Sequence, residues 1–300
     1  MEDASELRNL QSIPRLAPRQ MDSHKGTYGH ALLLGGSVGM SGALWIAGQT
    51  CLRGGAGLVT LAVPDKVQMV LSVAIPCAMT LGLRSNEESG EWWEQIRAPK
   101  YRDCVLAIGP GLGRSPESDA LVWRCWLEWP HAALFDADAL NTLAADRPRF
   151  ADDCAIPCAP RVLTPHPGEW ARLTGNQNID AARDRRLAAQ MARRLRAVVV
   201  LKGSRTWVTD GTSCFESRTG NPSLAVGGSG DALTGLITAM MCQGMKPMDA
   251  AILGVHLHGL AADLAHESLG TPSTLATDLL DFLPAAFRRL DNESPTPSSR

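Results

Sequence analysis

Short runs of consecutive apolar residues recur along the chain, and each ends at glycine, proline or aspartate. Runs without polar alternation are typical of strands that are buried on both faces. The six runs cover 31–36, 57–64, 104–110, 132–138, 161–165 and 197–203. Helical patterns separate most of them, and the clearest span 41–53, 116–129 and 181–195. This alternation predicts repeated βαβ units and a mostly parallel sheet.

The pattern changes after residue 202. Two short alternating pieces, 205–210 and 213–217, flank an Asp210-Gly211 dipeptide, which favours a hairpin and therefore an antiparallel edge. Three helices are then predicted, at about 229–242, 250–266 and 277–290. The polar ends, 1–20 and 291–300, are predicted to be tails that flank one domain over 21–290.

The composition of the chain argues against several classes of function. The chain has 300 residues, 45% of them hydrophobic, so it can bury a large core, and its net charge of −2 comes without a basic stripe. We therefore expect small-molecule partners and neither nucleic acid nor a membrane. No signal peptide or apolar stretch of membrane-spanning length is apparent, so the expected location is the cytoplasm, with the eight cysteines as reduced thiols.

The most informative segment is 220–244, GNPSLAVGGSGDALTGLITAMMCQG, in which glycines run directly into an apolar helical pattern. A helix start is an anion site, because its backbone N–H groups are free and the helix dipole is positive there. Asp231 falls in the first turn, where it can accept the proton of a hydroxyl that attacks a bound phosphorus. The alternative is that Asp231 only caps the helix and the glycines only turn the chain.

Two further glycine-bearing segments follow predicted strands. Segment 202–206, KGSRT, can hold nucleotide phosphate or ribose through its backbone and the Thr206 hydroxyl, or it can form an ordinary β-turn. Segment 109–113, GPGLG, can bring backbone against a flat or anionic ligand, or it can turn the chain from strand to helix. Ligands of parallel sheets lie beyond the carboxyl ends of the strands, so both segments are candidate binding loops.

Polar side chains lie at the carboxyl ends of two other predicted strands. In LTPHPGE, 163–169, His166 is either a structural histidine or a substrate contact, and the two flanking prolines favour the second because they hold it rigidly where a substrate is expected to lie. In FDADALN, 135–141, Asp136 and Asp138 either cap the next helix or lie close to a metal or a phosphate.

Several common motifs are missing. The glycines of 35–43 do not fit G-x-G-x-x-G, which argues against a Rossmann dehydrogenase, and no G-x-x-x-x-G-K-[ST] occurs. His256, His258 and His266 do not form H-E-x-x-H, so we expect them to pack in the core or to support the site residues, and not to bind a metal.

Taken together, six ordered motifs resemble the nucleotide-dependent NAD(P)H-hydrate dehydratase family of the ribokinase-like superfamily. The resemblance covers about 25–290 and rests on GGSVGMSGA, GPGLG, DADALN, LTPHPGE, KGSRT and GNPSLAVGGSGDALTG. It implies a three-layer α/β/α fold with a mostly parallel central sheet and an antiparallel edge. The implied reaction phosphorylates the C6 hydroxyl of S-form hydrated NADH or NADPH and eliminates phosphate.

The resemblance also implies roles for individual residues. Asp231 would be the catalytic base, and it would contact the hydrated cofactor together with Ala43, Gly113 and His166. The nucleotide would be bound by Lys202, Gly203, Ser204, Arg205, Thr206, Gly227, Gly228, Ser229 and Gly230. No residue is assigned to a metal.

The same resemblance implies partners. ADP, or else ATP, would be the co-substrate, accompanied by Mg²⁺, and a homo-oligomer, a tetramer in many relatives, is expected. Many bacterial relatives carry an epimerase domain ahead of the dehydratase, and the roughly 20 preceding residues are too few for one, so a separate hydrate epimerase is expected. The tryptophan-rich stretch 123–129 is either an assembly surface or core packing.

Two other functions compete. A ribokinase-like kinase acting on a thiazole or pyrimidine vitamin precursor would share the glycine-rich loop and its aspartate, but LTPHPGE and GGSVGMSGA match the dehydratase pattern specifically. A nucleotide-binding regulatory protein without turnover is the third hypothesis, and the presence of Asp231 argues against it.

Overall fold

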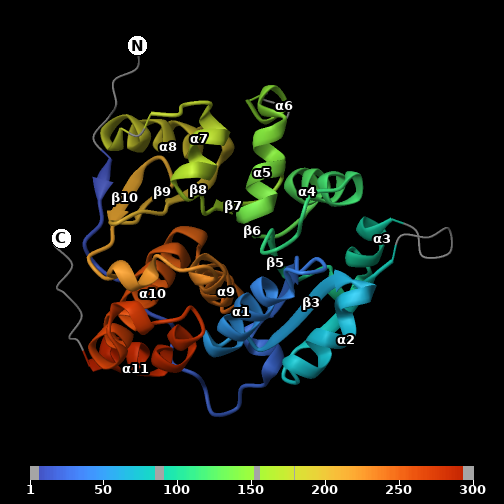
Figure 1. Ribbon diagram of the computed structural model, residues 1–300, viewed down its shortest axis with the longest axis horizontal. Coiled ribbons are helices and arrows are strands. Elements are labelled where there is room, and N and C mark those ends of the chain that lie inside the picture. The colour runs from blue at the N-terminus through green and yellow to red at the C-terminus, as the bar shows by residue number, and fades with distance from the viewer. Residues whose placement is uncertain (1–6, 85–90, 152–155, 179, 293–300) are drawn as a thin grey trace.

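A ten-stranded sheet runs through the described part of the chain (Figure 1). The computed structural model describes residues 7–84, 91–151, 156–178 and 180–292. The strand order is β1-β10-β9-β8-β7-β6-β5-β2-β3-β4. The strands are β1 (Arg8–Asn9), β2 (His30–Leu34), β3 (Leu58–Pro64), β4 (Met79–Leu83), β5 (Val105–Ile108), β6 (Ala133–Phe135), β7 (Arg161–Leu163), β8 (Ala197–Leu201), β9 (Trp207–Thr209) and β10 (Ser213–Glu216).

Helices cover both faces of the sheet, because successive apolar side chains of the central strands point to opposite sides. In β2, Ala31 and Leu33 join one core and Leu32 and Leu34 join the other, all of them fully buried. The first core is completed by α1 (Ser41–Arg53), α2 (Asp65–Ala74), α9 (Ser229–Cys242), α10 (Pro247–Leu269) and α11 (Asp278–Asn292). The second is completed by α3 (Trp92–Ile96), α4 (Pro116–Glu128), α5 (Ala137–Ala145), α6 (Arg147–Ala151), α7 (Pro167–Thr174) and α8 (Ala181–Leu195).

The predicted three-layer α/β/α fold is therefore confirmed. The six apolar runs contain β2, β3, β5, β6, β7 and β8, all paired in parallel. The hairpin at Asp210-Gly211 is the antiparallel pair β9 and β10. Short 3-10 turns complete the structure: η1 (Lys25–Tyr28), η2 (Pro99–Tyr101), η4 (Pro222–Leu224) and η5 (Thr271–Ser273).

Two strands lie where the sequence analysis placed none. β4 is an edge strand whose first residue, Met79, is 45% exposed, and Gly82 interrupts its apolar pattern. β1 lies within 1–20, the segment predicted to be a tail, and pairs with β10. Within the same segment, Arg19 stacks on Tyr28, 3.9 Å from the ring centroid, and so holds the chain against η1. Residues 1–6 and 293–300 of the predicted tails lie outside the described residues.

The strand order reverses between β2 and β5, which creates a topological switch point. The chain runs outward from β2 to β3 and β4, returns to β5 on the other side of β2, and then continues through β6, β7 and β8. The glycine loops after β2 and β5 therefore meet: the Gly36 amide donates to the Pro110 carbonyl at 2.9 Å, and the Ser37 amide donates to the Gly111 carbonyl. A ligand crevice is expected at this edge of the sheet.

Helix α9 is held against this edge by a close approach to α1. A Cβ added at Gly235 would lie 2.0 Å from the Ala47 carbonyl oxygen, so only glycine permits this helix spacing. Residues 232–242 are all buried, which fixes the helix along its length. The start of α9, with Gly230 and Asp231, is thereby positioned at the carboxyl ends of the strands.

Arg161, the first residue of β7, is fully buried, and its side chain caps the carboxyl end of helix α4. Its guanidinium donates to backbone carbonyls of Cys125, Trp126, Trp129, His131 and Pro160 at 2.8 to 3.3 Å. A cation at a helix carboxyl end also interacts favourably with the helix dipole.

The tryptophans on and after α4 belong to the core. Trp126 and Trp129 are at most 1% exposed, and Trp126 makes an edge contact with Phe135. Of the two alternatives for 123–129, core packing is confirmed for these residues.

Replacing Arg161 by methionine should destabilise the fold strongly, because several buried carbonyls would lose their donors. We expect a loss of about 3 to 5 kcal/mol in the free energy of unfolding. Urea unfolding followed by tryptophan fluorescence measures it, with Arg161→Lys, which keeps the charge but has fewer donors, as an intermediate control. A loss under about 1 kcal/mol in Arg161→Met would contradict this role.

Candidate functional site

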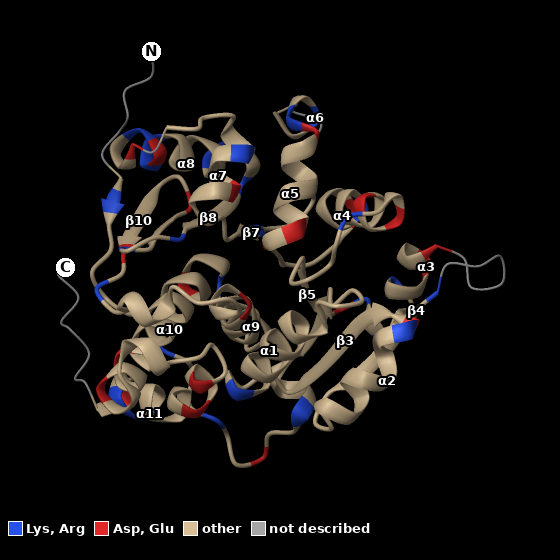
Figure 2. Ribbon diagram, in the orientation of Figure 1, with Lys and Arg blue, Asp and Glu red and all other residues tan. Residues whose placement is uncertain are grey.

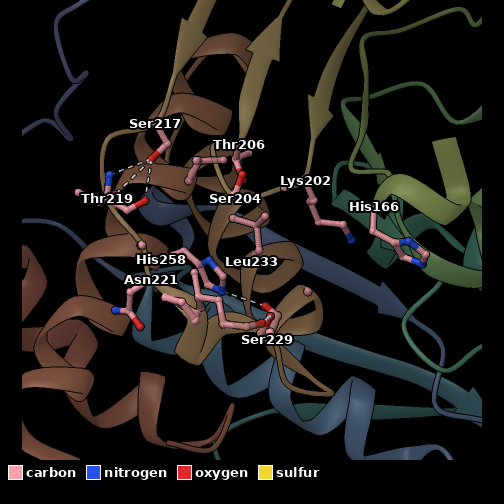
Figure 3. A pocket seen from close by; sticks show the side chains of 18 of the residues that line it. His166, Lys202, Ser204, Thr206, Ser217, Thr219, Asn221, Ser229, Leu233 and His258 are labelled. Carbon is pink, nitrogen blue, oxygen red and sulfur yellow. Dashed lines mark hydrogen bonds between the residues drawn. The ribbon is translucent and has the colours of Figure 1, made fainter. Parts of the chain in front are cut away.

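A cavity of about 730 Å³ lies at the carboxyl ends of β7 and β8, beside the start of α9 (Figure 3). Its walls come from the segment after β8, the stretch between β10 and α9, the first turns of α9 and the middle of α10. The lining residues are His166, Pro167, Lys202, Gly203, Ser204, Thr206, Ser217, Thr219, Gly220, Asn221, Pro222, Leu224, Ala225, Val226, Ser229, Gly230, Leu233, Val255, His258 and Gly259.

Six of the nine residues predicted to bind nucleotide line this cavity. They are Lys202, Gly203, Ser204, Thr206, Ser229 and Gly230. Arg205, Gly227 and Gly228 do not line it. The two segments are about 25 residues apart in sequence, and they meet because the first turn of α9 lies close to Lys202 after β8. Local sequence pattern alone does not indicate this contact.

The start of α9 has the geometry of an anion site. Its N-cap is Gly228, which has a left-handed backbone (φ 94), and no side chain caps the helix. A Cβ at Gly228 would come within 2.7 Å of Ile46 Cδ1, so the turn requires glycine both sterically and conformationally. An uncapped helix start directs backbone amides and the positive end of the dipole toward the cavity.

Asp231 occupies the first turn of α9, one residue beyond the cavity-lining Gly230. Burial and the neighbouring Asp136 carboxylate raise its pKa to about 7, although Lys202 acts in the opposite direction. The N-cap residue of α9 is Gly228, so Asp231 lies three residues beyond the N-cap position. A carboxylate with this pKa is suited to accept a proton near neutral pH.

Lys202 is held by two buried carboxylates, Asp136 at the end of β6 and Glu169 in the first turn of α7. Its Nζ lies 2.8 Å from Asp136 Oδ1 and 3.9 Å from Glu169 Oε2. Asp136, which is 1% exposed, accepts a second hydrogen bond from the Thr234 hydroxyl of α9 at 2.8 Å. Asp136 is the N-cap residue of α5, but its side chain makes no capping hydrogen bond, so the capping alternative is wrong for its carboxylate.

Asp138 connects the switch-point loop to α5. One carboxylate oxygen accepts from the Gly113 amide at 2.8 Å, and the other accepts from Asn141 Nδ2 at 3.3 Å. Nearby, Ala43 approaches the same loop: a Cβ at Gly111 would lie 3.1 Å from the Ala43 Cβ. Ala43 and Gly113 therefore lie at the ends of β2 and β5, away from the lining of the 730 Å³ cavity.

His166 sits at the mouth of the cavity, as the N-cap of α7. Its Nδ1 accepts from the Gly168 amide at 3.0 Å, so its Nε2 is the atom that faces Glu169 Oε1, at 3.2 Å. Burial lowers the pKa of His166 and raises that of Glu169 to about 7. The ring is 49% exposed and remains available to a ligand.

Several site residues had no assigned role in the sequence analysis. The Thr234 hydroxyl donates to the Asp136 carboxylate, and the Glu169 carboxylate accepts from the His166 amide. Asp263 of α10 accepts from the Gly220 amide and from Asn221 Nδ2, and so fixes the wall of the cavity. Thr234 and Asp263 contact partners that are distant in sequence, so no local spacing indicates them, whereas Glu169 lies three residues after His166 and forms a capping box with it. His258, expected to pack in the core or to support the site residues, is buried and bonds the Ser229 carbonyl at 2.9 Å.

The described residues have three further properties, which concern metal binding, disulfides and membrane-spanning helices. They contain no group of three or more His, Cys, Asp or Glu side chains that could hold a metal ion. All seven cysteines among them are free. In the same part of the chain, the helices are too short or too polar to span a membrane.

Solved structures share this architecture. The crystal structure of the ADP/ATP-dependent NAD(P)H-hydrate dehydratase from Bacillus subtilis, co-crystallised with ATP/Mg²⁺, superimposes with a TM-score of 0.73 and 31% identity, covering 93% of this chain and 94% of that one. A ribokinase-like superfamily protein from Enterococcus faecalis gives a TM-score of 0.75 at 24% identity, covering 94% of this chain and 95% of that one. This second likeness concerns the fold alone, which is ribokinase-like.

Proteins with similar sequences are named for the repair or dehydration of NAD(P)H hydrates. The chain is 43% identical over 288 residues to the bifunctional NAD(P)H-hydrate repair enzyme Nnr of Moorella thermoacetica, covering 94% of this chain and 53% of that protein. It thus spans about half the length of the bifunctional relatives that it matches. It is 33% identical to the ADP-dependent (S)-NAD(P)H-hydrate dehydratase of Bacillus subtilis, covering 92% of this chain and 95% of that one.

A family model described as NAD(P)H-hydrate dehydratase matches residues 31–285, which include every candidate site residue described above. The order of motifs, the ribokinase-like fold and this match agree, and the chain belongs to the NAD(P)H-hydrate dehydratase family.

Proposed function

We propose that the chain dehydrates the S-form of hydrated NADH and NADPH, using ADP as co-substrate and restoring the reduced cofactor. The observation that carries this proposal is the position of Asp231: a half-buried carboxylate with a pKa of about 7, one residue beyond a glycine that lines a nucleotide-sized cavity. Family membership supports the reaction class, and the name of the Bacillus subtilis relative supports ADP and the S-form.

The nucleotide would occupy the 730 Å³ cavity with its terminal phosphate at the start of α9. Backbone amides of the uncapped helix start would bind the phosphate oxygens. Thr206 and Ser204 line the same cavity and would hydrogen-bond the nucleotide. Arg205 and the backbone of Gly227 and Gly228 would shape the loops without lining the cavity.

The reacting ring would lie on the other side of Asp231, toward Ala43, Gly113 and His166. Asp231 accepts the proton of the C6 hydroxyl, and the hydroxyl oxygen attacks the terminal phosphorus of ADP, so that AMP leaves. The ring-nitrogen lone pair then expels inorganic phosphate from C6. Loss of a C5 proton restores the dihydropyridine, so hydrate and ADP yield NAD(P)H, AMP, phosphate and a proton.

The described residues do not fit a resident metal centre, because no three potential ligands converge and Asp136 and Asp138 already have partners. We therefore propose that Mg²⁺ enters as part of the nucleotide complex, held by phosphate oxygens and water. No step above is assigned to it.

The defining experiment incubates the protein with hydrated NADH and ADP and follows recovery of the near-ultraviolet absorbance of NADH. Parallel reactions contain thiazole or pyrimidine alcohols with ATP. Recovery with hydrate and ADP supports the proposal, whereas phosphorylation of the alcohols alone would instead indicate a vitamin-precursor kinase. Because the proposed reaction takes the S-form, the R-form would first have to be epimerised at another active site. A homo-tetramer stays a prediction that sedimentation can test.

The first prediction concerns the base. Asp231→Asn should lower kcat by about 100-fold or more, because general-base catalysis contributes factors of about 10² to 10⁴. The Kd for ADP, measured by calorimetry, should stay close to that of the wild type because the amides of α9 are retained. Turnover within about threefold of the wild type would exclude Asp231 as the base.

The second prediction is a pH profile. Asp231 must be ionised to accept a proton, so kcat should rise as the pH increases through about 7 and level off above it. In Asp136→Asn, a negative neighbour that raises the pKa of Asp231 is removed, so the acidic limb should move to lower pH.

Glu169→Gln is the matched control for that profile. Glu169 also has a pKa of about 7, but it does not contribute to the pKa of Asp231. The limb should therefore persist in Glu169→Gln. Its disappearance in that variant would assign the titration to Glu169.

The third prediction concerns the phosphate site. A Cβ at Gly230 would lie 3.2 Å from Lys202 Nζ, so Gly230→Val should crowd both the ammonium and the phosphate and nearly abolish ADP binding. At Gly227 an added Cβ meets nothing within 4 Å, so Gly227→Val should change the Kd for ADP much less. Equal Kd values for the two variants would mean that the segment only turns the chain.

A further inference from the structure

A second cavity, of about 740 Å³, lies between α5, α7 and the segment that follows the switch-point loop. It shares no lining residue with the 730 Å³ cavity. Its lining residues are Arg114, Asn141, Ala144, Ala145, Arg147, Ala171, Arg172, Gly175 and Gln177. The ionisable residues among them are all arginines, and Figure 2 shows basic residues on α6 and α7, the helices that supply Arg147 and Arg172. We call this the arginine cavity.

Two of its guanidinium groups form no ion pair within the described residues. Arg114 is bound to Asp119 through two hydrogen bonds, at 2.6 and 2.9 Å. Within the residues that the structure describes, by contrast, no carboxylate lies within 4.0 Å of the Arg147 or Arg172 guanidinium. These groups therefore leave N–H donors for an anionic ligand.

Both arginines are held in position. Arg172 Nε donates to Asn141 Oδ1 at 2.8 Å, which leaves its terminal nitrogens free of any described partner. Arg147 lies against Gly175, where an added Cβ would come within 1.9 Å of Arg147 Nη1. Gly175 has a left-handed backbone at the end of α7, so the residue that ends this helix also makes room for the guanidinium.

The arginine cavity adjoins the side of the site that is proposed to hold the hydrated ring. Asn141, which positions Arg172, also donates to Asp138, and Asp138 binds the Gly113 amide. A Cβ added to Gly168 would lie 3.6 Å from Arg172 Nη1, and Gly168 is two residues after His166. The guanidinium therefore lies close to the loop that carries His166. A ligand bound near Gly113 and His166 can therefore extend into this cavity.

We propose that the arginine cavity binds phosphate groups of the hydrated dinucleotide, through Arg147 and Arg172. This proposal rests on the proposed function and extends it to the part of the substrate that does not react. The dinucleotide carries a pyrophosphate, and its NADPH form also carries a 2′-phosphate. Planar guanidinium groups bind phosphate oxygens through paired hydrogen bonds, and the volume is typical of a small-molecule site.

Direct binding tests the arginine cavity without turnover. The protein is first saturated with ADP, which fills the nucleotide cavity, and is then titrated calorimetrically with ADP-ribose or with 2′-phospho-ADP-ribose. The variant is Arg147→Gln combined with Arg172→Gln. Arg186→Gln, which removes an exposed arginine on α8 that lines neither cavity, is the matched control.

The double variant should bind at least one probe about tenfold or more weakly, since charge-assisted hydrogen bonds to phosphate are lost. Equal weakening for both probes would assign the pyrophosphate to the arginine cavity, and weakening for 2′-phospho-ADP-ribose alone would assign the 2′-phosphate. The Arg186→Gln control should bind like the wild type. Absence of binding to the ADP-loaded wild type, or Kd values for both probes within about twofold in the double variant, would overturn the proposal.

Kinetics separate this inference from the proposed function. If the wild type dehydrates hydrated NADPH, the double variant should raise KM for the hydrate about tenfold and leave the Kd for ADP unchanged. If the wild type shows no dehydration, the proposed function fails, but the calorimetric result still decides whether the arginine cavity binds phosphates. A rise in the Kd for ADP in the double variant would mean that the substitutions disturb the nucleotide cavity, and it would count against the inference.

Discussion

The site depends on one buried ion pair, between Lys202 and Asp136. A buried charge is costly unless it is paired and hydrogen-bonded, and this pair meets that condition through Thr234 and the nearby Glu169. Burial disfavours the charged form of Lys202, yet Asp136 and Glu169 raise its pKa overall. The pair joins the end of β8 to the end of β6, and Thr234 ties both to α9. The ends of β6 and β8 and the first turns of α9 are therefore held together at the Asp136 carboxylate.

The same pair contributes to the electrostatic environment of Asp231, the proposed base. Burial and Asp136 raise the pKa of Asp231, whereas Lys202 lowers it, so two fixed charges of opposite sign act on this carboxylate. The backbone is strained at this point: Ala137, which follows Asp136, has a φ of 49, which costs about 1 kcal/mol or more for a residue with a side chain. That turn lets Asp136 point toward Lys202 while Asp138 reaches the Gly113 amide.

The sequence was informative where the signal is local. Buried strands were predicted from unbroken apolar runs, and the antiparallel edge from Asp210-Gly211, because both patterns reflect constraints within a few residues. The sequence was much less informative about which side chains meet. Lys202 and Asp136 are 66 positions apart, and four of the five carbonyls that surround Arg161 belong to the end of α4 and the residues after it, 30 to 36 positions away. Such contacts are fixed by the packing of elements and leave no spacing to recognise.

The N-terminal segment has a consequence for solubility. β10 would be the outermost strand on its side of the sheet, but β1 covers it: the Arg8 amide donates to the Thr212 carbonyl, and the Leu10 amide donates to the Cys214 carbonyl. An uncovered strand edge is a template for pairing with other chains. The few residues around β1 therefore act as a guard against edge-to-edge aggregation, and a shortened chain without them would present β10 to its neighbours in solution.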